Sequence, residues 1–219
     1  FRMSESTLLT RFKQSAAMLM ARRPETPFDW IFLMQHYGVP TRLLDWSENP
    51  LVATYFALEK DEEKDEDAAL WILRPSDLNK NANIKDDFES DYIPSFDDEE
   101  VSGYSTEQLR RTQRTKLLPI ATIATRNNPR IQAQLGTFTI HHNEMIPIEE
   151  VGDKSHCKKY TIPRDSKQRL REELTILGVN RFSLFPEIES IGYALFLTEP
   201  QFEENFQTET YFLSYGAKE

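Results

Sequence analysis

Side chains that could bind or transform a ligand are concentrated between residues 35 and 50. This stretch reads Gln-His-Tyr-Gly-Val-Pro-Thr-Arg-Leu-Leu-Asp-Trp-Ser-Glu-Asn-Pro and lies between two apolar, periodic segments. Its candidate site residues are His36, Tyr37, Thr41, Arg42, Asp45 and Asn49. Gly38 and Pro40 predict a turn that brings these side chains together. A histidine, an aromatic ring, a hydroxyl, a guanidinium and a carboxylate in one place suit a ligand that combines phosphates with a flat ring.

Several of these residues also have a purely structural interpretation. Arg42 and Asp45 either pair with each other and stabilise the turn, or face a ligand. His36 either interacts with the negative end of a preceding helix or contacts the ligand. Asn49 followed by Pro50 predicts a helix N-terminus with Asn49 as its cap. The free N–H groups at such a helix end suit an anionic ligand.

Other kinds of site find little support in the sequence. It contains no G-x-S-x-G, no phosphate-binding glycine loop and no G-x-G-x-x-G. His141 and His142 are adjacent, so on a strand their side chains point to opposite faces. Cys157 is the only cysteine, which excludes a disulfide within the chain and a cysteine-based metal site. We therefore expect no metal centre.

Length and charge limit the class of protein. The 219 residues suffice for one sizeable domain, and the net charge of -10 argues against a broadly basic, nucleic-acid-binding surface. The one concentrated basic patch comprises Arg110, Arg111, Arg114 and Lys116. No apolar run approaches the roughly 20 residues of a membrane span, and cysteine usage favours a reducing, cytoplasmic setting. Because the chain begins with Phe1, we expect an N-terminally trimmed domain.

The elements that must position the site follow from apolar periodicity. Helices are predicted from Ser4 or Ser6 to about residue 21, from Thr26-Pro27 to Gly38, from Pro50 to about Lys60, from Asp165 to Leu177 and from Phe185 to Leu197. Strands are predicted over residues 68–73, which form a buried run, and over 117–122, 136–141 and 158–162. Residues 59–67 read as an acidic loop, and residues 75–103 as a long polar excursion outside the core.

This order of elements indicates a fold class. Helices dominate the first third, and the short strands lie mainly in the middle of the chain. We therefore predict a single α+β domain over residues 1–219, with a helical first third packed on a small, mostly antiparallel sheet.

The stretch from Gln35 to Pro50 resembles the signature of the FRG domain family, Q-H-[YH]-G-x-P-T-R-L-L-D-W-[ST]-x-N-P. Phe1-Arg2-Met3 stands where that family has an aromatic-Arg-Gly triplet. Residues 130–138 and 177–186 also resemble the family pattern, so the resemblance extends over nearly the whole chain. It implies that Arg2 ends a strand and points into a cleft beside the central stretch.

The succession of an aromatic-arginine strand, a polar turn with strand and helix, and a later polar strand is similar to that of ADP-ribosyltransferases. This resemblance implies that Arg2 contacts NAD and that Thr41, with Tyr37 as a stacking partner, shapes the nicotinamide site. It places Gln134 near the usual position of a catalytic glutamate. Gln134 is not a carboxylate, so Asp45 is a candidate to supply that charge. Alternatively, Gln134 satisfies backbone groups.

Three functional hypotheses follow. The leading one is an NAD-using enzyme that modifies a macromolecule or hydrolyses NAD, with NAD as substrate and no metal. The second is a non-catalytic module that binds a phosphorylated ligand, a nucleic acid or a protein partner, with the Arg110–Arg111 helix meeting phosphates. The third is a phosphodiesterase or nuclease that uses His36, Arg42 and Asp45.

Overall fold

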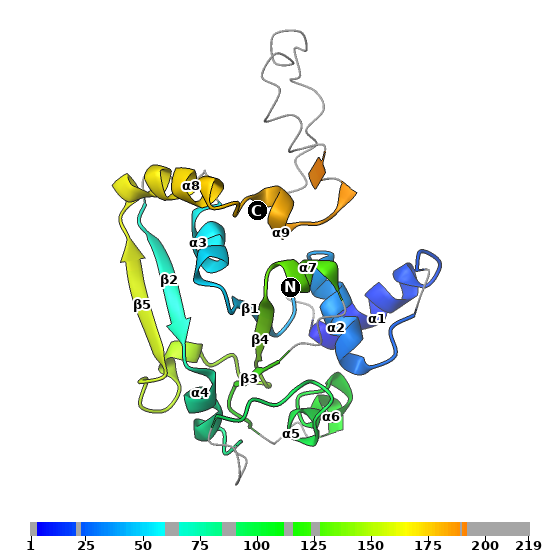
Figure 1. Ribbon diagram of the computed structural model, residues 1–219. Helices are drawn as coiled ribbons and strands as arrows, with labels where there is room; N and C mark the ends of the chain where they lie inside the picture. Colours follow the sequence, from blue (N-terminus) through cyan, green and yellow to red (C-terminus); the bar gives the residue numbers. More distant parts are fainter. Residues whose placement is uncertain are drawn as a thin grey trace.

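The computed structural model describes residues 4–20, 23–59, 66–84, 91–111, 116–123, 128–188 and 190–191. It confirms the predicted α+β class, because helices surround two small antiparallel sheets (Figure 1). The helices are α1 (Glu5–Ala16), α2 (Pro27–His36), α3 (Pro50–Leu58), α4 (Pro75–Asn81), α5 (Glu99–Ser102), α6 (Thr106–Arg111), α7 (Pro129–Ala133), η1 (Ile148–Glu150), η2 (Arg164–Ser166), α8 (Lys167–Ile176) and α9 (Arg181–Leu184). The strands are β1 (Leu43–Ser47), β2 (Ala68–Leu73), β3 (Ile120–Thr122), β4 (Gly136–Ile140) and β5 (Cys157–Ile162).

The larger sheet carries the central stretch of the sequence. Its strand order is β1-β4-β3, and both neighbouring pairs are antiparallel. Asp45 lies opposite Phe138, and Trp46 lies opposite Thr137. The Trp46 indole Nε1 donates a hydrogen bond to the Thr139 hydroxyl at 3.1 Å. This pairing places the polar residues of β1 beside the strand that follows α7.

Helix α2 leads directly into this sheet. It starts with a capping box between Thr26 and Asp29 and ends in a turn at Gly38, whose φ is 73°. The Gly38 N–H donates to the Gln35 carbonyl at 2.9 Å, and the Val39 N–H donates to the Met34 carbonyl at 2.9 Å. These two bonds form a Schellman motif. The predicted end of this helix at Gly38 is therefore confirmed.

Helix α1 is shorter than predicted. Ser4 caps it, as expected, but it ends at Ala16, and Leu19 is 86% exposed. Met20 still packs with the cluster formed by Leu9 and α2, and it does so from irregular chain after the turn at residues 17–19. The helical spacing of apolar residues thus continues past Ala16 because Met20 packs on this cluster, and not because the helix continues.

The prediction that residues 75–103 lie outside the core is wrong for the described part of that segment. α4 and α5 fall within it, and Leu78, Asn79 and Val101 are fully buried. The Asn79 amide accepts from the Ala121 N–H at 2.7 Å and donates to the Ala121 carbonyl at 3.0 Å. The Asn79 side chain therefore pairs with the backbone of β3 as a neighbouring strand would. The sequence did not predict this role, because the residues around Asn79 are mostly polar.

The main core lies between α2 and the larger sheet. It joins Phe28 and Ile31 of α2 to Leu43, Ile120, Phe138 and Ile140 of the sheet and to Phe96, Val101 and Tyr104. The helical first third thus packs on the sheet as predicted. Arg42 enters this layer as a buried cation.

The second sheet pairs β2 with β5, and α3 and α8 pack against it through Leu58, Ile162 and Leu174. The strand over residues 68–73 was predicted correctly, but its predicted burial is wrong. Trp71 is 37% exposed and Ile72 is 48% exposed, because in the described part of the chain this sheet consists of two strands and has an open face.

Later elements differ in extent from the predictions. The strand predicted over 117–122 is confined to β3, and α8 ends before Gly178, whose φ is 78°. The short helix α9 occupies residues 181–184, where none was predicted; Asn180 and Ser183 form its capping box. Most of the predicted helix from Phe185 to Leu197 lies outside the described residues, as does most of the acidic stretch 59–67. Across the described part of the chain, no helix has the length and apolarity to cross a membrane.

Candidate functional site

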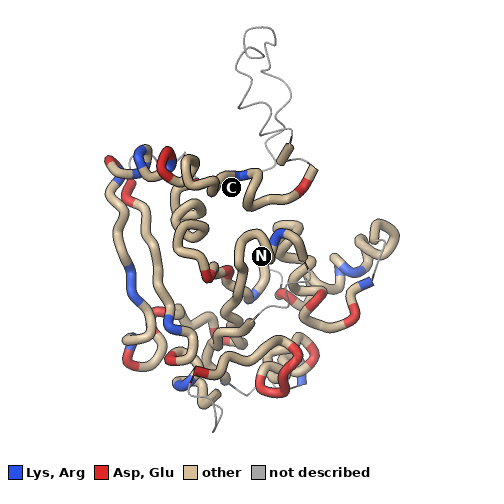
Figure 2. Tube along the Cα trace, in the orientation of Figure 1, with Lys and Arg blue, Asp and Glu red and all other residues tan. Residues whose placement is uncertain are grey.

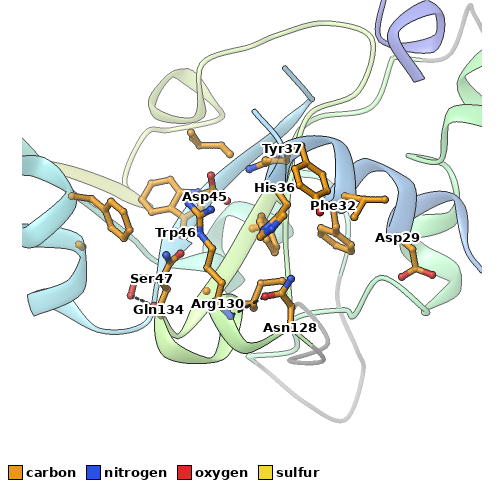
Figure 3. Close-up of a pocket in the computed structure, with 18 of the residues that line it drawn as sticks. Asp29, Phe32, His36, Tyr37, Asp45, Trp46, Ser47, Asn128, Arg130 and Gln134 are labelled. Atoms are coloured by element: carbon orange, nitrogen blue, oxygen red, sulfur yellow. Dashed lines mark hydrogen bonds between the residues drawn. The ribbon is translucent and has the colours of Figure 1, made fainter. Parts of the chain in front are cut away.

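A cavity of about 1190 Å³ is lined by residues of both sheets and of α2, α3 and α7. Aromatic and amide-bearing side chains dominate the part around β1 (Figure 3). The lining residues in that part are Phe32, Gln35, His36, Tyr37, Asp45, Trp46, Ser47, Asn128, Arg130 and Gln134. A cavity of this size exceeds the roughly 300–1,000 Å³ of typical small-molecule sites. It has room for a ligand of dinucleotide size.

Asp45 is the carboxylate of β1 that faces this cavity. Its side chain is accessible to solvent and lies among the other residues that line the cavity. Partial burial among these residues raises the pKa of Asp45, while a hydrogen bond from the Gln35 side chain and the nearby Arg130 charge act in the opposite direction. Figure 3 shows Arg130 extending from α7 toward Asp45. A carboxylate with a perturbed pKa in a cleft marks a candidate functional site.

Thr41 and Gln35 are joined by a hydrogen bond across the turn. The Thr41 hydroxyl donates to the Gln35 Oε1 at 2.6 Å and accepts from the Leu43 N–H at 3.2 Å. Thr41 is not among the residues that line the cavity, whereas Gln35 is. The Thr41 hydroxyl, which was predicted to contact a ligand, therefore binds Gln35, and Gln35 lines the cavity in its place. No sequence signal indicated that Gln35 lines the cavity.

His36 and Tyr37, the two residues at the end of α2 for which a ligand contact was considered, line the cavity. Their rings meet edge to face with centroids 4.9 Å apart, and Tyr37 is 67% exposed. The His36 Nε2 lies 4.0 Å from a carboxylate oxygen of Glu187. The Tyr37 ring is therefore available for stacking against a planar ligand group.

Arg42 does not reach the cavity, and its predicted pairing with Asp45 is wrong. Its Nε donates to the Glu5 carboxylate at 2.6 Å, and the other guanidinium nitrogens donate to the carbonyls of His141 at 3.1 Å and Tyr104 at 2.8 Å. Glu5 also accepts from the Arg42 backbone N–H at 2.9 Å. Arg42 thus joins α1 to the sheet, and a direct ligand contact is not supported by its position. The nuclease hypothesis loses one of its three residues for the same reason.

Gln134 lies on the cavity wall at the C-terminus of α7. Its Nε2 donates to the Leu184 carbonyl at 3.1 Å, and its backbone carbonyl accepts from the Ser47 hydroxyl at 2.7 Å. The alternative interpretation, in which Gln134 satisfies backbone groups, is thereby confirmed. The NH₂ group of the Gln134 side chain is bonded to Leu184, the last residue of α9.

Arg130 is the site residue that sequence reasoning missed. Its guanidinium lies over the Phe185 ring, 4.6 Å from the centroid, and Arg181 lies on the same ring at 5.0 Å. This stacking holds Arg130 at the cavity wall, where it could bind an anionic group. The available signal was its position after Asn-Asn-Pro, which predicts a helix start and hence an oriented first turn.

Of the other predicted site residues, one has a structural role and one lies outside the described part of the chain. Asn49 caps α3, as predicted, by accepting from the Leu51 N–H at 2.9 Å, and it does not line the cavity. Arg2 lies outside the described residues. The cavity also includes Cys157, but burial and nearby Glu149 raise the pKa of this thiol, which disfavours a nucleophilic thiolate at neutral pH.

His141 and His142 are both buried in the interior of the protein. His141 Nε2 lies 3.0 Å from the Ile146 carbonyl, and His142 is 1% exposed against the Tyr104 ring. Within the described ranges, no three His, Cys, Asp or Glu side chains are grouped so as to hold a metal ion.

The predicted basic patch is only partly described. Arg111 is exposed, Lys116 is paired with Glu144, and the Arg110 side chain and Arg114 lie outside the described residues. Figure 2 shows basic and acidic residues interspersed along the described chain rather than gathered on one face. This distribution gives no support for an extended phosphate-binding surface.

Comparison with known families finds a match in the N-terminal part of the chain. Residues 2–66 match the family model of the FRG domain. The predicted family resemblance is therefore confirmed for residues 2–66, a segment that contains α1, α2, β1 and α3. Residues 130–138, several of which line the cavity, and residues 177–186, which do not line it, both lie beyond that range. No curated protein and no solved structure matches the chain.

Proposed function

We propose that the cavity binds a nucleotide of the NAD class and that Asp45 promotes cleavage of its N-glycosidic bond. The observation that carries this proposal is the position of Asp45, which faces an aromatic-lined cavity between Gln35 and Arg130. A negative charge on a partly desolvated wall stabilises positive charge developing on a bound ligand more strongly than it would in water.

The chemistry requires one carboxylate and no metal. The bond between the ribose C1′ and the nicotinamide nitrogen breaks, and its electron pair leaves with the neutral nicotinamide. The cationic ribose carbon is then captured by an oxygen of water or of an acceptor, which gives up its proton to Asp45 or to solvent. Asp45 would stabilise the cation, and Arg130 would hold a phosphate of the ligand.

Asp45 suits this role better than the other candidates. Gln134 has no charge, and one end of its amide binds Leu184. Asp29 also lines the cavity, but its carboxylate accepts from the Thr26 N–H at 2.8 Å in the capping box of α2. For Asp45, burial is the largest influence and raises the pKa of the carboxyl, while Gln35 and the Arg130 charge act in the opposite direction.

Calorimetric titration with NAD and an assay of released nicotinamide test the proposal. We expect wild-type protein to bind NAD and release nicotinamide, and Asp45→Asn to bind within a few-fold while its release rate falls roughly 100-fold. Asp165→Asn is the matched control, since it removes the same charge from an exposed site outside the cavity. We expect wild-type behaviour from it.

Two further variants locate the ligand. Arg130→Ala should weaken NAD binding, because it removes the cation from the cavity wall. Arg2→Ala tests the contact implied by family resemblance, since Arg2 lies outside the described residues. Failure of wild-type protein both to bind NAD and to release nicotinamide with any acceptor would remove the basis of the proposal.

A second candidate is a non-catalytic module that binds a phosphorylated ligand in the same cavity. It is favoured by Thr41 and Gln134, two of the residues predicted to be catalytic, which are engaged in hydrogen bonds within the protein. NAD binding that depends on Arg130, with no nicotinamide release under any condition, would favour this alternative.

A further inference from the structure

The second sheet, formed by β2 and β5, turns one of its faces toward the cavity. Trp71 of β2 lies opposite Lys159 of β5 in the antiparallel pairing. Cys157 lies opposite Leu73, two positions further along each strand. Residues that are paired in this way, or two positions apart on one strand, share a face of the sheet. Since Ala69, Trp71 and Cys157 all line the cavity, the face that carries Trp71 and Lys159 is the one that borders it.

The other face of this sheet packs on helices. Ile162 is buried with Leu58 of α3 and Leu174 of α8. Leu70 lies on the same face, opposite Tyr160. Leu70 also borders the cavity, although its side chain packs with the α3–α8 cluster. The next residue along β2 therefore points away from α3 and α8.

That next residue is Trp71, which forms an aromatic–cation pair with Lys159. The Lys159 Nζ lies 5.6 Å from the centroid of the Trp71 ring. Both side chains are exposed, so a ligand in the cavity can cover them. An indole ring stacks well on a nucleobase, and a lysine ammonium binds a phosphate as a point charge. A base stacked on Trp71 would have its phosphate close to a positive charge.

The charges around this pair favour one placement of the phosphate. η1 lies beside the start of β5, since the His156 Nε2 is 2.8 Å from the Ile148 carbonyl. Glu149 of η1 lines the cavity there, and its carboxylate repels a phosphate. We therefore expect the phosphate at Lys159. Arg130, elsewhere on the cavity wall, is the cation available to a second phosphate.

We infer that Trp71 and Lys159 form a second subsite of the cavity, which binds the adenosine phosphate half of a dinucleotide while the wall around β1 binds the other half. The inference rests on the proposed function, because it identifies the ligand of the same cavity as a dinucleotide rather than a mononucleotide. Tyr37 and Trp46 supply the aromatic rings of the other part of the wall. The cavity of about 1190 Å³ thus presents aromatic rings for two bases.

The two halves of NAD test this subsite separately. Adenosine monophosphate and nicotinamide mononucleotide are each titrated into wild-type protein and variants, and binding is followed by NMR, which also measures weak affinities. In Trp71→Leu, we expect the Kd for adenosine monophosphate to rise roughly tenfold, because the stacking surface is lost. The Kd for nicotinamide mononucleotide should stay near its wild-type value. Trp71→Phe keeps a ring and should retain most of the affinity for adenosine monophosphate.

The same sheet supplies matched controls on its other face. Lys159→Ala should weaken the binding of adenosine monophosphate and reduce its salt dependence, because a phosphate contact is lost. Lys158 lies opposite Ile72, and Tyr160 lies opposite Leu70, both on the face that packs on α3 and α8. Lys158→Ala and Tyr160→Leu remove the same kinds of side chain there. Both variants should bind the two ligands as wild-type protein does.

The outcomes separate this subsite from the proposed enzyme activity. The inference is overturned if wild-type protein does not bind adenosine monophosphate, or if folded Trp71→Leu binds it as well as Tyr160→Leu does, even when nicotinamide is released from NAD. A selective loss in Trp71→Leu, with NAD bound more tightly than either half, would support it even if no nicotinamide is released. If Trp71→Leu does not fold, the shift of the Trp71 indole N–H signal on addition of adenosine monophosphate, assigned with Trp71→Phe, decides the question.

Discussion

The buried contact between Arg42 and Glu5 leads to a prediction about stability. Arg42→Ala removes three side-chain hydrogen bonds, to the Glu5 carboxylate and to the carbonyls of His141 and Tyr104. The Arg42 side chain is 9% exposed and that of Glu5 is 15% exposed, so water replaces these bonds poorly. Removing one partner of a buried ion pair costs about 3–5 kcal/mol. We expect Arg42→Ala to lower the free energy of unfolding by that amount.

Glu5→Ala should cost less, about 2 kcal/mol, because the guanidinium keeps its two carbonyl partners. Urea unfolding of both single variants and the double variant gives the coupling energy. We expect the double variant to be less destabilised than the sum by about 1–3 kcal/mol. Since a domain has roughly 5–15 kcal/mol of stability, these effects are within measurable range.

The exposed pair between Arg169 and Glu173 is the matched control. Its Nε–Oε1 distance is 2.8 Å, but the Arg169 side chain is 83% exposed. We expect Arg169→Ala to cost about 0.3–0.5 kcal/mol. A cost for Arg42→Ala below about 1 kcal/mol, or additive effects in the Glu5–Arg42 cycle, would refute the reasoning from burial. Loss of ligand affinity without loss of stability in Arg42→Ala would instead indicate a direct ligand contact.

Three further predictions concern other parts of the fold. Gly38→Val should destabilise the protein by about 1–2 kcal/mol or more, because the backbone φ at this position is 73°. Pro40→Ala should cost less than about 1 kcal/mol. Equal melting temperatures of the two variants would contradict this prediction. Asn79→Ala should cost about 2–4 kcal/mol in urea unfolding, because it leaves the buried N–H and carbonyl of Ala121 without partners. Burial, and secondarily Arg42, lowers the pKa of His142, so stability should fall as the pH drops below about 6.5, where only the unfolded state gains this proton. His142→Phe should flatten that pH dependence of the melting temperature, and an unchanged slope would show that other groups cause it.

Local sequence signals predicted much of the fold around the site. Asn49 and Pro50 begin α3, Gly38 ends α2, and Gly178 follows α8, because caps and positive φ depend on residues only a few positions apart. The strand over residues 68–73 was also predicted with its observed bounds. The same local signals failed for residues 75–103, where surface polarity conceals the buried side of α4.

The sequence by itself determined the resemblance to the FRG domain family, the α+β class and the concentration of polar residues around the turn. Only the tertiary structure decided which of them face the cavity. Arg42 is bound by Glu5, 37 residues earlier in the chain, whereas Arg130 arrives beside Asp45 from a distant helix. The physical reason is that ion pairs and cavity walls depend on which segments pack together. A local pattern of residue types does not record that packing.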